Sequence, residues 1–140
     1  MKINEKKINQ TLKNEVFNQY CEDLIIATKT KQLFLKPNLS IKDLSNETGI
    51  PVEEVNTVLR EKLKLTFFEF LSEFKVNRAK KLLTNISEDQ LSFSSIAAQS
   101  GFNTKDSFLT IFEEHTKMSP KEYRIKYFTI DHDSSARLEN

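Results

Sequence analysis

The 140-residue sequence is poor in residues that interrupt regular structure, with only two glycines and three prolines. Sheet-rich folds need more turn residues, and the apolar residues recur at helical rather than alternating spacing, so the sequence predicts an all-α fold. A single cysteine, Cys21, excludes an intramolecular disulfide, and the N-terminus lacks the apolar region of a secretory signal. We therefore expect a reducing, cytoplasmic environment.

Long apolar runs and clustered chemical groups are also missing. The strongest apolar stretch, Leu24 to Ala27, is far shorter than the roughly 20 residues that span a bilayer, so membrane insertion is not expected. His115 and His132 have no companion at metal-ligand spacing, and the chain has no glycine-rich phosphate loop. The sequence thus predicts no metal, no cofactor and no enzymatic activity.

The chain has almost no excess of either charge, because its 21 Lys and Arg residues are nearly balanced by 20 Asp and Glu residues, which gives a net charge of +1. Domains that bind nucleic acid often show a clear basic excess. Charge alone therefore does not predict DNA binding, which would require the basic residues to cluster on one face.

What the sequence does contain is a succession of amphipathic segments. We expect residues 1–14 to be a frayed polar leader, followed by a helix from Val16 to near Lys31, an apolar plug at Leu33–Leu35 and a helix N-cap at Ser40. The clearest periodicity predicts a helix over about 67–83, preceded by Thr66 as a cap. A last helix is expected to start at Ser119-Pro120, and residues from 129 onward to be loose.

An internal repeat organises these segments. A shift of about 52 residues places the only two glycines, Gly49 and Gly101, on each other. The same shift pairs Ile41 with Phe93, Leu44 with Ile96 and Ser45 with Ala97. With one more residue in the second turn, the repeat also pairs Val55 with Phe108, Leu59 with Phe112, Lys64 with Lys117, Thr66 with Ser119, and Phe70 with Tyr123. Each copy has a short helix, a turn with glycine and a second helix, which is the pattern of a helix-turn-helix.

Two such units can read successive major grooves of B-DNA if their second helices lie about 34 Å apart. The predicted helix over 67–83, roughly 25 Å long at 1.5 Å per residue, is positioned in the sequence to space them. Tandem helix-turn-helix units joined by one long helix are therefore the predicted architecture, preceded by an N-terminal helix.

The sequence resembles the DNA-binding domain of the AraC/XylS family of bacterial regulators over roughly residues 34–128. The matching motifs are Leu39 to Ser45, Phe70-Leu71, Lys75-Val76, Ala79 to Leu83, Ile96-Ala97, Gly101-Phe102, Phe108, Phe112 and Ser119 to Arg124. The resemblance implies a double helix-turn-helix domain over 36–128, which leaves the expected leader and amphipathic helix over 1–35 before it and a flexible tail over 129–140 after it. Within the domain it implies a first unit at about 40–64, the linker helix at about 67–83 and a second unit at about 93–117.

The resemblance also implies which residues face DNA. The recognition helices fall at about 52–63 and about 104–114. Candidates for base reading or nearby contact are Glu53, Asn56, Thr57, Arg60, Asn103, Thr104, Lys105, Asp106, Leu109 and Thr110. Candidates for phosphate contact are Ser40, Lys64, Lys117, Lys121 and Arg124.

Several positions depart from the family pattern. Thr57 and Thr110 stand where many members carry an arginine, and Glu113 and Glu114 where two basic residues are usual. Lys64 and Lys117 replace glycine, and Pro51 replaces a capping serine. The acids would repel a nearby phosphate backbone, so tight DNA binding by the second unit does not follow.

Two functions are consistent with these observations. The first is sequence-specific binding of duplex DNA by a bacterial transcription regulator that inserts two recognition helices into adjacent major grooves and contacts RNA polymerase. The alternative is a degenerate module that acts through protein contacts with weak or no DNA binding. Many relatives attach this domain to a sensor, so the chain is either a stand-alone regulator or a piece of a longer one.

Overall fold

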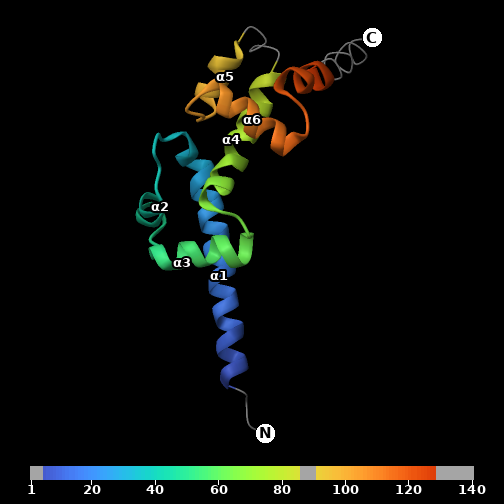
Figure 1. The fold of residues 1–140 in the computed structure, drawn as a ribbon. Coiled ribbons are helices and arrows are strands. Elements are labelled where there is room, and N and C mark those ends of the chain that lie inside the picture. The colour runs from blue at the N-terminus through green and yellow to red at the C-terminus, as the bar shows by residue number, and fades with distance from the viewer. Residues whose placement is uncertain (1–4, 86–90, 129–140) are drawn as a thin grey trace, which may run out of the picture. The chain divides into compact units, whose positions relative to one another are not determined.

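The computed structural model describes residues 5–85 and 91–128, and these residues form helices joined by short turns, without a β-strand (Figure 1). The all-α prediction is therefore confirmed. None of the helices in these two ranges is both long and apolar enough to cross a membrane. The chain divides into two compact units, Met1–Phe70 and Leu71–Asn140, each with its own buried core.

The first unit begins with α1, which spans Glu5–Thr30. The prediction of a frayed leader over residues 1–14 is wrong for residues 5–14, while residues 1–4 lie outside the described ranges. No glycine or proline occurs before Pro37, and Ile8 and Leu12 already stand at helical spacing, so nothing in the sequence interrupts the helix. Burial nevertheless begins only at Phe17, so the first three turns of α1 are exposed.

The rest of the first unit packs on the C-terminal half of α1. The predicted plug is a 3₁₀ helix, η1 (Leu33–Leu35), that buries Leu33 and Phe34. Then follow α2 (Ile41–Thr48), α3 (Val52–Thr57) and a π-helical turn, η2 (Val58–Leu63), which contacts α1. A hydrogen bond with Glu54 of α3, its main cause, raises the pKa of Tyr20 on α1. These contacts hold α3 and η2 on α1.

The second unit is built from the remainder of α4 (Phe67–Thr84), which begins in the first unit, and from α5 (Phe93–Gln99), α6 (Lys105–Thr116) and a helical segment over 120–128. Its core joins residues of α4, α5 and α6 around Phe108 and Phe112, which are fully buried. Tyr123 packs edge-on against Phe112 with ring centroids 5.3 Å apart. The predicted linker helix and last helix thus exist, while the expected polar connection over 86–90 and the tail lie outside the described residues.

The backbone repeats as the sequence does. Gly49 and Gly101 both have positive φ, 77° and 92°, in the turns after α2 and α5. Lys64 and Lys117 close the helices that follow, with φ of 57° and 62°. These four positions show that the two copies share turn geometry as well as a hydrophobic pattern, which confirms two helix-turn-helix subdomains.

Candidate nucleic-acid interface

The first helix-turn-helix is fixed by a capping box and a bridged turn. Ser40 Oγ accepts a hydrogen bond from the Asp43 N–H at 3.1 Å, and the Asp43 carboxylate accepts one from the Ser40 N–H at 2.9 Å. The Ser40 N–H is the main reason that the pKa of Asp43 lies below its usual value. Past Gly49, the Ser45 hydroxyl donates to the Ile50 carbonyl, which ties α2 to the residue before Pro51. The turn therefore sets the direction of α3.

The outward face of α3 and η2 carries the predicted base-reading residues. Glu53, Asn56 and Arg60 are exposed, at spacings of three and four residues that place them on one side of the helix. Thr57 is only half exposed, and its hydroxyl donates to the Glu53 carbonyl at 2.9 Å. The polar groups of Glu53, Asn56 and Arg60 are thus exposed. The Thr57 hydroxyl is instead hydrogen-bonded within its own helix.

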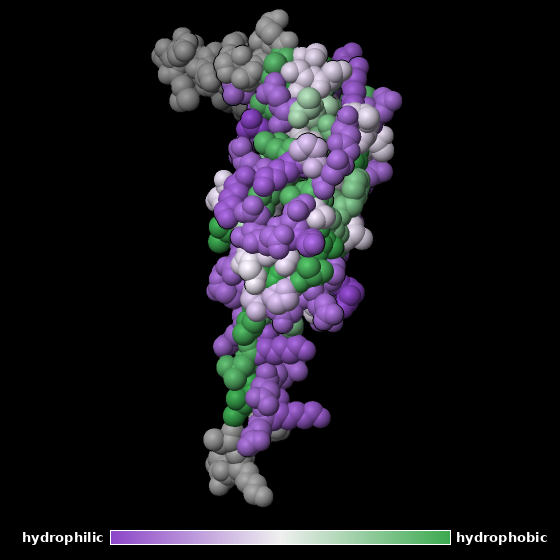
Figure 2. Space-filling model, turned by 90° about the vertical axis from the view of Figure 1, so that its left-hand side faces the viewer, coloured by the Kyte–Doolittle hydropathy of each residue, from purple (hydrophilic) through white to green (hydrophobic). Residues whose placement is uncertain are grey.

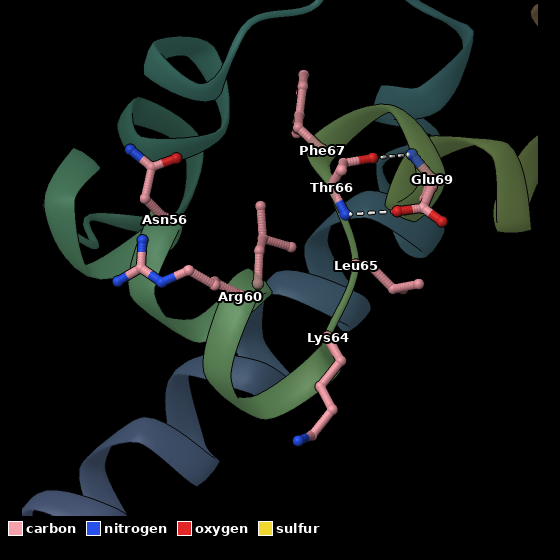
Figure 3. Close-up of a pocket in the computed structure, with 8 residues that line it drawn as sticks. Asn56, Arg60, Lys64, Leu65, Thr66, Phe67 and Glu69 are labelled. Carbon is pink, nitrogen blue, oxygen red and sulfur yellow. Dashed lines mark hydrogen bonds between the residues drawn. The ribbon is translucent and has the colours of Figure 1, made fainter.

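A hollow of about 560 Å³ lies beside this face (Figure 3). Asn56 and Arg60 line one side, and Thr66, Phe67 and Glu69 line the other. Thr66 and Glu69 form a second capping box, with both hydrogen bonds at 3.0 Å. The sequence indicated Thr66 as a helix cap but not its place in the wall of the hollow, which follows the left-handed residue Lys64 in the chain.

The second helix-turn-helix presents all but one of its predicted base-reading residues. Thr104 caps α6 by accepting from the Ser107 N–H at 3.0 Å, and Phe102 is buried behind the turn. Leu109 is partly buried against the core of its own unit, so its side chain faces inward more than predicted. The other predicted residues of this face are exposed: Asn103, Thr104, Lys105, Asp106 and Thr110.

The predicted phosphate contacts separate into two kinds. Lys64, Lys117 and Lys121 are exposed, and the Ser40 hydroxyl still has its proton to donate. Arg124 instead is half-buried, with its Nε donating to the Leu83 carbonyl at 3.2 Å and its guanidinium 5.3 Å from the centre of the Phe93 ring. The structure therefore gives Arg124 a role in holding the second unit together.

Acidic residues outnumber basic ones on both recognition helices. From Val52 to Leu63, Glu53, Glu54 and Glu61 stand against Arg60 and Lys62, and Arg60 lies 3.9 Å from Glu61. On α6, three acids stand against Lys105. These acids are Asp106, Glu113 and Glu114, and all are exposed. The net negative charge of α6 is thus larger than that of α3–η2, so α6 should repel a phosphate backbone more strongly.

Two further groups of the second unit have neighbours that the sequence did not indicate. The Lys75 ammonium lies 5.9 Å from the Phe102 ring centre, and burial lowers the pKa of Lys75. The Nδ1 of His115 donates to the Ile111 carbonyl at 3.0 Å, and its Nε2 lies 3.8 Å from Glu73 Oε1. In the described part of the chain, no group of three or more His, Cys, Asp or Glu residues is arranged to hold a metal ion.

A family model described as a helix-turn-helix domain matches residues 44–126. An uncharacterized HTH-type transcriptional regulator of Staphylococcus aureus (strain COL) is 30% identical over 117 residues, which cover 83% of this chain and 14% of the relative. The HTH-type transcriptional activator RhaR of Mannheimia succiniciproducens is 26% identical over 106 residues, covering 71% of this chain and 37% of the relative. The chain therefore spans only a small part of the length of these curated relatives.

Two solved structures share the fold. A DNA-binding transcriptional dual regulator from Escherichia coli K-12 superposes with a TM-score of 0.62 at 19% identity, covering 73% of this chain and 87% of the other. The C-terminal domain of the two-component response regulator yesN from Fusobacterium nucleatum gives 0.59 at 21% identity, covering 76% of this chain and 98% of the other. At this level of identity the likeness concerns the fold alone.

Proposed function

We propose that this chain, which belongs to the AraC-type helix-turn-helix family of bacterial transcription regulators, binds duplex DNA sequence-specifically by inserting α3–η2 and α6 into adjacent major grooves. The observation that carries the proposal is the repeated turn, in which Gly49 and Gly101 both adopt positive φ and each directs an exposed second helix outward. A helix of this kind fits the major groove, where base edges are distinguishable. In this proposal α4 spaces the two helices.

The first unit supplies the stronger contacts. The exposed amide of Asn56 matches the donor and acceptor that adenine presents in the major groove, and the exposed Arg60 guanidinium matches guanine or a phosphate. Lys64 and the Ser40 hydroxyl are placed to reach phosphates, and Glu53 can accept a hydrogen bond from cytosine. The hollow beside Asn56 and Arg60 leaves room for a strand of the backbone.

The second unit contributes further contacts from a helix that carries more acidic than basic residues. Lys105 and Thr110 are exposed for base or phosphate contact, Asn103 and Thr104 lie at the N-terminus of α6, and Lys117 and Lys121 follow it. Asp106 adds a possible acceptor for cytosine. Glu113 and Glu114 work against the phosphates, so we expect α6 to add specificity more than affinity.

The proposal is tested by selecting bound sequences from a random duplex pool and titrating the winner with salt. We expect a two-part motif whose half-sites lie one helical turn apart. Replacing Asn56 and Thr57 with alanine should weaken binding by about tenfold or more, since one bidentate contact to a base is worth roughly 1–3 kcal/mol. Asn14→Ala, an exposed asparagine on the first turns of α1, serves as the matched control and should bind as wild type.

Two outcomes would contradict the proposal. Recovery of no motif at low salt would exclude sequence-specific binding. A footprint covering only one half-site, about half of the roughly 20 base pairs expected, would exclude the use of both recognition helices by one chain.

A second candidate function rests on the charge of α6. Because three exposed acids accompany Lys105 there, α6 is also suited to a basic protein surface. Replacing both Glu113 and Glu114 with glutamine separates the two functions. The double variant should bind DNA more tightly at low salt, because it lacks the two acids that repel phosphates. It should bind a basic protein more weakly. Contact with RNA polymerase, and control by a sensor domain in a longer protein, would be further steps beyond DNA binding.

A further inference from the structure

The first three turns of α1 carry an apolar stripe that nothing else in the described chain covers. Ile8, Leu12 and Val16 are 42%, 54% and 47% exposed, and they follow one another at intervals of four residues. Figure 2 shows apolar side chains in a row along this end of the helix, next to hydrophilic ones. The buried face of α1 begins at Phe17, on another side of the helix.

Such a segment is weakly stable by itself. Residues 5–16 are exposed on all sides, and isolated helices of about this length are marginal in water because most helical stability comes from packing an apolar face. Residues 5–16 contain no glycine or proline, so nothing in this segment breaks the helix. A surface of this kind gains stability from a partner helix.

The charges beside the stripe identify the partner. Glu5, Asn9 and Lys13 form one flanking row, and Lys7, Thr11 and Glu15 form the other, so each row has an acid at one end and a base at the opposite end. When two copies of this segment run in opposite directions, like rows face each other. Glu5 then meets Lys13 of the second copy, and Lys7 meets its Glu15, while the apolar stripes pack with Ile8 near the second copy's Leu12.

We propose that the N-terminal turns of α1 form an antiparallel helix pair with a second copy of this chain. The pair joins two double helix-turn-helix domains without using either recognition helix. It is independent of DNA, so it can be tested whether or not the proposed DNA function holds.

The test is the oligomeric state of the full chain, measured by sedimentation equilibrium over a range of concentrations. Reducing agent is kept present, because the half-buried free thiol of Cys21 would otherwise permit a disulfide-linked dimer. We expect reversible dimers in wild type and an association at least about tenfold weaker for Ile8→Gln with Leu12→Gln, because two apolar side chains lose their burial. Ile26→Gln, which alters an apolar residue of α1 that is 56% exposed outside the stripe, should leave the dimer unchanged.

A charge exchange tests the direction of the pair. Glu15→Lys should weaken association by placing two lysines together, and adding Lys7→Glu in the same chain should restore it. Wild type that stays monomeric, or an Ile26→Gln variant that dissociates as readily as the stripe variant, would overturn the proposal. Failure of the double exchange to restore association would overturn the antiparallel arrangement. Circular dichroism of each variant would show that α1 remains helical.

Discussion

Lys64 offers a sharp test of the backbone geometry, because it ends η2 with φ of 57°, in the left-handed region that favours glycine. The N–H groups of Lys64 and Leu65 both point to the Leu59 carbonyl, which closes the helix end as a left-handed cap does. A residue with a Cβ costs roughly 1–2 kcal/mol in this conformation. Glycine removes that cost but loses roughly 0.5–1 kcal/mol in the entropy of the unfolded chain. Lys64→Gly should therefore raise the free energy of unfolding by about 0.5–1 kcal/mol.

Urea unfolding followed by circular dichroism measures this change as a higher midpoint at an unchanged slope. Lys62→Gly is the matched control, since Lys62 is an exposed lysine within η2 and should lose about 1 kcal/mol on becoming glycine. Lys64→Ala keeps the Cβ and should leave stability nearly unchanged. If Lys64→Gly destabilised the chain as Lys62→Gly does, the left-handed cap at Lys64 would be refuted.

The same substitutions separate stability from DNA binding. Both Lys64→Gly and Lys64→Ala remove the ammonium, so both should weaken DNA binding and reduce the slope of log affinity against log salt by about 0.9 if Lys64 contacts a phosphate. A more stable but more weakly binding Lys64→Gly protein would show that the lysine is retained for its charge. Equal DNA affinity of wild type, Lys64→Gly and Lys64→Ala would show that Lys64 does not contact DNA.

Three further predictions concern the two units. Thr104→Ala removes the cap of α6 and should lower the free energy of unfolding by about 1 kcal/mol in urea, whereas Thr104→Ser should retain most of it. Phe112→Ala empties a fully buried site and should cost about 3–5 kcal/mol by the same measurement. Hydrogen bonding from Ser40 lowers the pKa of Asp43 in the folded state. The contribution of the Asp43 carboxylate to stability should therefore be complete above its unfolded-state pKa, near pH 4, and be lost as the pH falls through its folded-state pKa. Asp43→Asn changing the free energy of unfolding equally at every pH would contradict this.

The repeat was visible in the sequence because its local signals agree with the fold. The glycine in each turn and the Ser or Thr before several of the helices act within a few residues. The structure shows them as positive φ at Gly49 and Gly101 and as caps at Ser40 and Thr104. Hydrophobic spacing then determined which faces are buried. Such signals are local, so the sequence alone predicts the helices of both helix-turn-helix units.

Other features depend on contacts that spacing does not encode. Leu109 has the helical position of a base-reading residue but packs partly on the core, because an apolar side chain at the edge of the buried face gains by turning inward. Arg124 likewise donates a hydrogen bond to the carbonyl of Leu83, which lies 41 residues away in the sequence. The polar composition of residues 5–14 suggested disorder, although propensity and the absence of helix breakers favour a helix there. The exposure of the candidate site residues thus agrees with the sequence on the turns and departs from it at the boundary of the core.

The shortage of basic charge on the recognition helices makes the exposed stripe of α1 relevant to DNA binding. A chain that neutralises few phosphates binds with little help from counterion release, so its affinity depends more on base contacts. Joining two chains through α1 would make the second encounter with DNA intramolecular, which raises the overall affinity without adding a contact within either chain. The acids on α6 would then limit non-specific binding by a single chain while leaving a paired chain able to hold a site with repeated half-sites. If both proposals hold, pairing through the stripe of α1 would add affinity, while the acids of α6 would favour specific over non-specific sites.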